Sequence, residues 1–409
     1  MRLECPGAPH LSYCTNIHPA ERWVEVRDNL ERYVTAVKRF VAPERPFGVG
    51  LRLSALAAEE LGEARNIERL AGFLEDRGLY VFTMNGFPYG RFHGSRVKEA
   101  VYRPDWQEDA RVVYSNRLAD VLVRLLPSSV AEGTISTVPG CFAPRATKPG
   151  AVEAMALGIA HHAAHLRRLR EKTGKRIVLA LEPEPFCHIE TSAQAAAFIA
   201  RYVVSDAGRA AFCQLTGLTG DHAEEVLREH VGVCLDLCHM AVVYEDLDDA
   251  LGHLASVGIR VAKVQLSAGL EMSPADALDG ALSDLARFAD DTYLHQVFEA
   301  GANGKSRRWL DLGEALASTS GVAPPRPWRV HFHVPLFQRR YGRLDGTQAY
   351  VEAMLARIAR TQVAPHLEVE TYTWDVLPAE LRCMSVVDAV TRELRWVQGE
   401  IERAARTQA

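Results

Sequence analysis

Short apolar runs alternate with longer amphipathic segments along almost the whole chain. The short runs have the near-continuous hydrophobicity of buried parallel strands, and the longer segments have the 3.6-residue period of helices. Such alternation is typical of βαβ units around a parallel sheet. The predicted helices include 19–40, 65–77, 114–126, 150–172, 193–204 and 347–358. The predicted strands are 10–17, 47–54, 79–85, 133–138, 177–182, 231–236, 261–267, 329–334 and 366–371.

Eight strand–helix repeats close a (β/α)8 TIM barrel, so one of these nine strands is expected to be an addition. The surplus is placed within 291–334, where residues 291–312 suggest an inserted hairpin around a Gly-Ala-Asn-Gly turn. A closing helix is predicted at 385–405, and no Gly/Ser-rich linker divides the chain. We therefore predict an α/β fold with a single TIM-barrel domain over 1–409, whose barrel core spans about 10–375.

A doubly wound sheet is the competing arrangement. That fold usually carries a Gly-x-Gly-x-x-Gly turn after its first strand. Here the first predicted strand leads into the glycine-free segment Cys14–Pro19, and the sequence has neither a Walker-type phosphate loop nor a Gly-x-Ser-x-Gly elbow. The barrel is the favoured prediction.

Composition narrows the functional class. A net charge of −5 argues against nonspecific binding of nucleic acid or of an anionic membrane. No apolar run is long enough for a transmembrane helix, and residues 1–10 lack the pattern of a signal peptide.

The eight cysteines are scattered, several of them in apolar runs, which favours reduced thiols. We expect a cytoplasmic protein that binds a small metabolite, with a homodimer and pathway partner proteins as open alternatives.

Three predicted strands end abruptly in acidic residues. Glu182, Asp236 and Glu370 stand at these ends, and Glu184 and His239 follow closely. All strands of a barrel end at one rim, so residues distant in sequence converge there. Because charges are rarely buried without a partner, the cluster predicts one shared divalent cation, Mn²⁺, Mg²⁺, Co²⁺ or Zn²⁺. Other polar residues of the predicted rim are Asn16, His18, Arg52, Asn85, Thr137, Gln265, His331 and His333.

Several of these segments resemble a known superfamily. Leu181–Pro183, Cys234–His239 and Val369–Glu370 are similar to the fifth, sixth and eighth strand motifs of xylose isomerase-like TIM barrels, which include sugar epimerases, inosose dehydratases and apurinic endonucleases. A closer resemblance, over roughly residues 10–375, is to the EboE group of bacterial metabolite traffic proteins. The segments that carry it are Tyr13–Pro19, Met84–Gly90, Tyr102–Trp106, Val264–Ser267, Tyr293–Val297 and Val330–Pro335.

The resemblance implies a divalent metal held by four side chains from strands five to eight. The three acidic residues at the strand ends match three of these positions, whereas Gln265 stands where a histidine is expected. A glutamine carbonyl can ligate a hard cation, but imidazole is the better ligand for zinc-like metals. His333, or less readily His331, is expected to supply the missing nitrogen, since both lie on one face of their strand.

The implied chemistry is proton transfer beside a substrate carbonyl. Glu182 and Glu370 would act as general base and acid while the cation stabilises an enediolate, and His239 would hydrogen-bond a substrate oxygen. The same groups could eliminate water from a polyol, because that reaction also starts with removal of an α-proton. The leading hypothesis is therefore a metal-dependent isomerase, epimerase or dehydratase acting on a sugar-like or polyol-derived metabolite.

The long aromatic segment from Phe87 to Trp106 directly follows a strand end. Long loops in compact barrels are usually lids or binding loops, so we expect Trp106 to form part of a substrate wall. His18, Asn85 and Glu184 are further predicted substrate contacts at the rim.

Two other hypotheses stand beside the enzyme. The first is a non-catalytic protein that binds a metabolite during its biosynthesis or traffic, which the EboE resemblance and Gln265 both favour. The second is an endonuclease-type phosphodiesterase, which needs several clustered metals and a basic track for DNA. The acidic net charge counts against that alternative.

Overall fold

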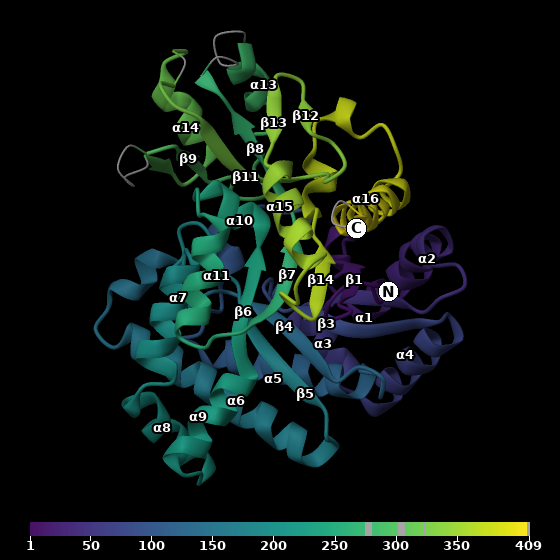
Figure 1. Cartoon of the computed structure of the whole chain (residues 1–409), viewed down its shortest axis with the longest axis vertical. Coiled ribbons are helices and arrows are strands. Elements are labelled where there is room, and N and C mark those ends of the chain that lie inside the picture. The colour runs from purple at the N-terminus through teal and green to yellow at the C-terminus, as the bar shows by residue number, and fades with distance from the viewer. Residues whose placement is uncertain (275–279, 302–306, 323, 407–409) are drawn as a thin grey trace.

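The computed structural model describes residues 1–274, 280–301, 307–322 and 324–406, and it contains the predicted barrel (Figure 1). The barrel strands are β1 (His10–Tyr13), β2 (Phe47–Arg52), β3 (Leu79–Asn85), β4 (Glu132–Thr137), β5 (Arg176–Leu181), β6 (Val231–Asp236), β7 (Val261–Leu266) and β14 (His366–Val369). They form one parallel sheet in the order β1-β14-β7-β6-β5-β4-β3-β2. With β14 as the eighth stave this order follows the chain, as successive βαβ units dictate.

The barrel is nearly closed, and Ser12 joins its two outermost strands. The Ser12 hydroxyl donates to the Gly48 carbonyl at 2.7 Å and accepts from the Gly50 amide at 2.9 Å. Further along the same strands, Cys14 forms a parallel backbone bridge with Gly50. A serine side chain thus supplements the backbone ladder where β1 meets β2.

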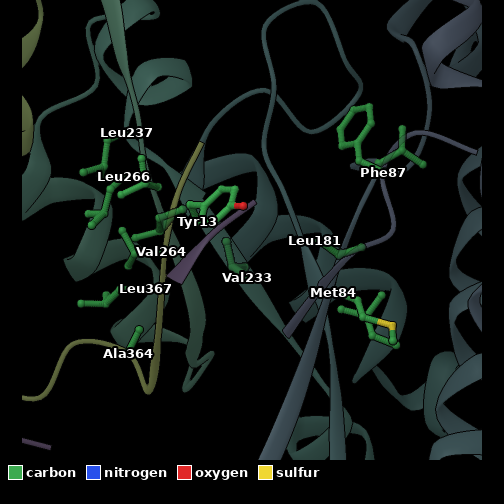
Figure 2. Packing of buried hydrophobic residues seen from close by; sticks show 14 of the residues in the cluster. Tyr13, Met84, Phe87, Leu181, Val233, Leu237, Val264, Leu266, Ala364 and Leu367 are labelled. Atoms are coloured by element: carbon green, nitrogen blue, oxygen red, sulfur yellow. The ribbon is translucent and has the colours of Figure 1, made fainter. Parts of the chain in front are cut away.

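Successive side chains of each barrel strand point alternately into the barrel and toward the surrounding helices. The side chains that point toward the helices are apolar. Val264 pairs with Leu367 on β14 and with Leu235 on β6, and Leu181 pairs with Val233. All five residues are buried, and Figure 2 shows Val264 and Leu367 close together on their neighbouring strands. Each such side chain contributes about 1.5–3 kcal/mol by leaving water.

Helices cover this outer face (Figure 1). They are α1 (Trp23–Asn29), α2 (Thr35–Val41), α3 (Ala55–Leu61), α4 (Ala64–Asp76), α5 (Asp109–Leu125), α6 (Ala151–Thr173), α7 (Ser192–Phe198), α8 (Asp206–Thr216), α9 (Gly220–His230), α10 (Leu237–Val242), α11 (Leu247–Ser256) and α15 (Gln348–Ile358). Ser54, Thr191, Ser205 and Asp246 cap α3, α7, α8 and α11 with their side chains. The six predicted helical segments are confirmed, although a π-helical turn over Leu30–Val34 divides the first of them.

The barrel interior holds a buried ion pair that the hydrophobic pattern did not reveal. Lys263 Nζ on β7 lies 2.5 Å from Glu368 Oε2 on β14, and neither side chain has exposed surface. Lys263 Nζ also lies 3.3 Å from Ser136 Oγ. Gly50 makes room for the pair, because a Cβ at that position would overlap the Glu368 carboxylate. The pair forms the layer directly below the residues at the rim.

The surplus strand belongs to a second sheet, which is larger than the predicted hairpin. Its elements are β8 (Ala268–Met272), β9 (Val297–Glu299), β10 (Arg308–Trp309), β11 (Trp328–Val334), β12 (Arg340–Tyr341) and β13 (Leu344–Gly346), with α13 (Leu282–Ala286) and α14 (Leu312–Thr319). The six strands form an antiparallel sheet in the order β10-β9-β11-β8-β13-β12, inserted between β7 and β14. Figure 1 shows this sheet as a separate layer beyond the end of the barrel.

The predicted hairpin is present within that sheet. Strands β9 and β10 pair antiparallel, and residues 302–306 between them lie outside the described residues. The candidate strand at 329–334 is β11, and its pairing with β8 and β9 removes it from the barrel. The extent of the insertion was underestimated because β8 continues the apolar run of β7 with only Ser267 between them.

The last described helix, α16 (Val386–Arg406), confirms the predicted closing helix. It packs against α15 and α2 on the outside of the barrel (Figure 1). Among the described helices, none combines the length and the hydrophobicity that a membrane span requires.

Candidate active site at the barrel mouth

Three carboxylates converge at the rim of the barrel. Glu182 follows β5, Asp236 ends β6 and Glu370 follows β14, and one oxygen of each lies within 4.8 Å of the others. All three residues are at most 4% exposed. Within the described part of the chain, Glu182 Oε2 and Asp236 Oδ2 have no hydrogen-bond partner. Because unpaired buried carboxylate oxygens are costly, the cluster has the character of a cation-binding site.

Burial and mutual repulsion set the protonation of this cluster. The pKa of Glu182 is raised well above its ordinary value by burial and by the charges of Glu370 and Asp236. Burial and Asp236 raise the pKa of Glu370 in the same way. Burial also works to raise the pKa of Asp236, but the side chains of His239 and His333, together with hydrogen bonds from the His239 backbone and Ser267, outweigh it and lower that pKa. Adjacent acids with oppositely shifted pKa values are a feature of proton-transfer sites.

Glu370 is held by three amide side chains. Asn16 and Asn85 donate to Oε1 at 2.6 and 2.8 Å, and Gln265 donates to Oε2. The oxygen of Gln265 lies 2.8 Å from the Cys234 thiol. In this arrangement Gln265 positions Glu370 through its N–H, and its carbonyl oxygen is engaged by Cys234.

The two carboxylate oxygens of Asp236 differ in their contacts. Its Oδ1 accepts from the backbone N–H of His239 at 2.9 Å, which caps α10, and from Ser267 Oγ at 2.8 Å. The strand end is therefore also the helix start, and the first turn brings His239 Nε2 to 3.7 Å from Oδ1. This geometry explains the Asp-x-x-His spacing in the sequence, and it leaves Oδ2 without a hydrogen-bond partner in the described part of the chain.

The imidazoles of His239, His331 and His333 line another side of the site. Each Nδ1 faces a carbonyl oxygen, at 2.9 Å (backbone, for His239), 2.6 Å (the Gln296 side chain, for His331) and 2.8 Å (backbone, for His333). A backbone carbonyl accepts only from a protonated nitrogen, so Nδ1 of His239 and of His333 carries a hydrogen, and Nε2 of either ring in its neutral form carries a lone pair.

The imidazole nitrogens lie close together. His331 Nε2 and His333 Nε2 are 3.2 Å apart, and one nitrogen each of His239 and His333 lies within 4.8 Å of an Asp236 oxygen. Burial lowers the pKa of both β11 histidines, that of His333 to about 4. Neutral imidazoles that are oriented by carbonyl groups are the form that binds metals.

Glu184 adds a fourth carboxyl group to the rim. It accepts from the Tyr102 hydroxyl at 2.8 Å, and that hydroxyl accepts from Gln296 Nε2 at 2.9 Å. Burial raises the pKa of Glu184 to about 7, against the opposing effects of His239 and Tyr102. Glu184 can therefore take up or release a proton at neutral pH.

One cavity, with about 50 Å³ of free space, is lined by three of the carboxyl groups (Glu182, Glu184 and Glu370), by the three imidazoles and by the amides of Asn16 and Asn85. We call its carboxylate, imidazole and amide lining the floor, and its apolar and aromatic lining the roof. The roof comes from residues 87–102, from Tyr293 and Leu294 of the insertion, and from Tyr372. The predicted loop after β3 thus does reach the cavity, as does Asn85 in the floor.

Two predicted substrate contacts lie elsewhere. Trp106 is 1% exposed, and its indole N–H donates to the Val138 carbonyl at 3.1 Å. The His18 ring stacks on Tyr33 with 4.2 Å between centroids, and its Nε2 lies 3.0 Å from the Tyr13 hydroxyl. Neither residue lines the cavity, so their contacts are those of the protein core.

Sequence reasoning missed Gln296 as a site residue, and it included Tyr102 only as one of the aromatic residues of the predicted binding loop. Both lie in segments that carry the EboE resemblance, Tyr102–Trp106 and Tyr293–Val297, so a signal was available. Tyr372, two residues after Glu370, was also missed, and its ring lies 4.7 Å from that of His333.

Comparisons with known proteins bear on the fold. No family model matches the chain, and no curated protein matches its sequence. A xylose isomerase-like TIM-barrel protein from Mycobacterium smegmatis, solved in complex with magnesium, is 10% identical with a TM-score of 0.50, over 98% of this chain and 100% of that one.

Two further solved structures are similar at lower TM-scores. The IOLI protein with a bound zinc atom is 12% identical with a TM-score of 0.47, over 96% of this chain and 97% of that one. A xylose isomerase domain protein from Planctomyces limnophilus is 13% identical with a TM-score of 0.47, over 91% and 93%. Together with the strand order, the likeness to the Mycobacterium smegmatis protein shows that this chain has the fold of a xylose isomerase-like TIM barrel.

Proposed function

We propose that the chain is a divalent-metal-dependent enzyme that moves a proton beside a carbonyl group of a sugar-like or polyol-derived metabolite. Isomerases, epimerases and many dehydratases share this first step. The observation that carries the proposal is the buried trio of Glu182, Asp236 and Glu370, in which two oxygens lack hydrogen-bond partners among the described residues. A magnesium complex of a protein with the same fold supports the choice of a divalent metal.

The residues at the rim fit such a metal. No described residue hydrogen-bonds to Glu182 Oε2 or Asp236 Oδ2, Glu370 lies beside them, and the neutral His333 ring presents an unprotonated Nε2. These four residues would hold the ion, and their mixed oxygen and nitrogen donors suit Mn²⁺, Mg²⁺, Co²⁺ or Zn²⁺. When bound, the metal would polarise the substrate carbonyl and stabilise the negative charge of an enediolate.

The chain's own groups would carry the proton. Glu182 and Glu370 are assigned as base and acid, and the three amide donors on Glu370 hold that carboxyl group in one orientation. His239 and Glu184 would hydrogen-bond substrate hydroxyls from the cavity floor. Because the pKa of Glu184 is about 7, it could also protonate a departing hydroxyl in a dehydration.

A non-catalytic metabolite-binding protein on the same barrel is the second candidate, and Gln265 favours it. Both polar atoms of that amide are engaged inside the protein, by Glu370 and Cys234, so the position supplies no metal ligand in this arrangement. Such a protein would carry its ligand within a cytoplasmic pathway of secondary-metabolite biosynthesis or traffic, alongside partner proteins. An endonuclease is disfavoured because Lys98, the one permanent cation among the described lining residues, is paired with Asp311.

Hydrogen exchange with solvent distinguishes the two candidates. Metal-loaded protein is incubated in D₂O with a panel of aldoses, ketoses and keto-inositols, and loss of the proton next to the carbonyl is followed by NMR. We expect exchange on at least one compound, slower by about 100-fold or more in Glu370→Gln. Glu402→Gln, at an exposed position of α16, is the matched control. Exchange that is unchanged in Glu370→Gln, or absent for every compound, would favour the binding protein.

A further inference from the structure

The roof of the cavity is chemically unlike its floor. Phe92, Val97, Val101 and Leu294 present hydrocarbon surface to the same cavity that the carboxylates and imidazoles line. Ligand sites bind apolar parts of a ligand through such walls and orient polar parts through a few fixed polar groups. A ligand that fills both sides must therefore have one polar end and one apolar end.

Most of the roof comes from two segments that contact each other, the loop after β3 and the insertion. The Val97 backbone N–H donates to the Thr292 carbonyl at 2.8 Å, which joins the loop after β3 to the insertion. The Phe92 ring lies 5.1 Å from that of Tyr293 and 5.2 Å from that of Tyr372. The free space of about 50 Å³ holds a cation and water but no sugar, so a ligand would part these rings and replace their contacts with its own.

The charges around the cavity argue against an anionic ligand. Among the described residues that line it, Lys98 alone carries a permanent positive charge. Its Nζ already donates to Asp311 Oδ2 at 2.6 Å and to the Asp290 carbonyl at 2.9 Å. A phosphate group would thus lack a free cationic partner and would share the cavity with Glu182 and Glu184.

We propose that the site takes an uncharged metabolite with a polyhydroxyl or keto-sugar head and an aryl or alkyl body, rather than a sugar phosphate. This inference rests on the proposed function, because the head is assigned to the metal-binding floor. The body would be buried against the roof, and that burial would supply much of the affinity.

Three hydroxamates with one head and different tails test the inference. A hydroxamate offers two adjacent oxygens to a metal, as an enediolate does, so every member of the series probes the same floor. Acetohydroxamate has almost no tail, benzohydroxamate has an aryl tail, and phosphoglycolohydroxamate has a phosphate tail. Their dissociation constants are measured by calorimetry on the full-length, metal-loaded protein.

We expect benzohydroxamate to bind about 10-fold more tightly than acetohydroxamate or better, from burial of the ring, and phosphoglycolohydroxamate to bind no more tightly than acetohydroxamate. If acetohydroxamate binds but the aryl tail adds nothing, or if the phosphate tail binds best, the inference is overturned while the proposed function stands. If none of the three binds to the metal-loaded protein, the proposed function fails and the inference fails with it.

A substitution in the roof tests whether the aryl tail binds there. Val101 is only partly buried, so Val101→Ser should fold, and it should lose most of the preference for benzohydroxamate while acetohydroxamate binds as before. The matched control is Val113→Ser, at a position 48% exposed on α5, which should keep the full preference. An unchanged preference in Val101→Ser would show that the aryl tail binds away from the roof and would overturn the inference.

Discussion

The barrel and the inserted sheet supply unlike parts of the same site. The barrel contributes carboxylates at strand ends, Glu182, Asp236 and Glu370, which parallel topology necessarily brings to one rim. The insertion contributes neutral imidazoles on β11, His331 and His333, because its sheet lies beyond the end of the barrel (Figure 1). The acids thus come from the barrel strands, whereas two of the three imidazoles and the roof residues Tyr293 and Leu294 come from the insertion.

Breaking the ion pair inside the barrel should have the largest of the predicted effects, and that effect is on the free energy of unfolding. Lys263→Met leaves Glu368 charged and without its partner in a fully buried layer, which should lower the free energy of unfolding by about 3–5 kcal/mol. Denaturant unfolding at neutral pH measures the loss. The matched control is Asp248→Asn, which breaks an exposed ion pair with Arg357 and should cost about 1 kcal/mol or less.

A double variant separates the charge from the packing. Lys263→Met combined with Glu368→Leu removes both charges, so it should recover much of the lost stability. Equal losses in the single and double variants would show that the pair stabilises the barrel by its shape and not by its charges.

The next largest effect should be the pH dependence of the unfolding free energy of the metal-free protein. The pKa of Glu184 rises from 4.5 to about 7 on folding, so the native state holds a proton that the unfolded chain has lost. That contribution to stability is fully present below pH 4.5 and is lost as the pH rises through about 7.

Glu184→Gln removes this titration. Between about pH 5 and 8, wild type should lose about 2–3 kcal/mol more of its unfolding free energy than this variant does. The comparison uses chelator-treated protein and denaturant unfolding at both pH values. Parallel pH profiles for the two proteins would contradict the raised pKa of Glu184.

Removing the nitrogen ligand should have the smallest effect of the three, and it compares the two parts of the site directly. His333→Ala leaves the three carboxylates in place, so Mg²⁺ affinity should change little while Zn²⁺ affinity falls about 10-fold or more. Competition with a chelator measures both affinities. His161→Ala, at an exposed position of α6, is the control, and an equal or absent loss for both metals would remove His333 from the ligand set.

Much of the barrel could be predicted because its strands are buried on both faces and end in polar residues. The apolar run at 231–236 and the acid that ends it identify β6 and its rim residue together. The capping of α10 by Asp236 then follows from the same few residues. Local sequence therefore contains the information for both the strand and the carboxylate position.

The insertion could not be predicted in the same way. The short strands β12 and β13 have little hydrophobic pattern, and β11 resembles a barrel strand until its antiparallel partners are known. The orientation of aromatic residues is also set by tertiary packing, so Trp106 turned into the core while Phe92 faced the cavity. Local pattern does not contain that information.

Metal content tests the central claim most directly. Protein purified without chelators, then offered Mn²⁺ or Zn²⁺, is compared by elemental analysis with Asp236→Ala and with the near-isosteric Glu182→Gln. Asp248→Ala, at an exposed position, serves as the control. We predict about one metal per chain in wild type and control, and its loss in both site variants. No bound metal in wild type, or equal metal in all four proteins, would contradict a cation site at these strand ends.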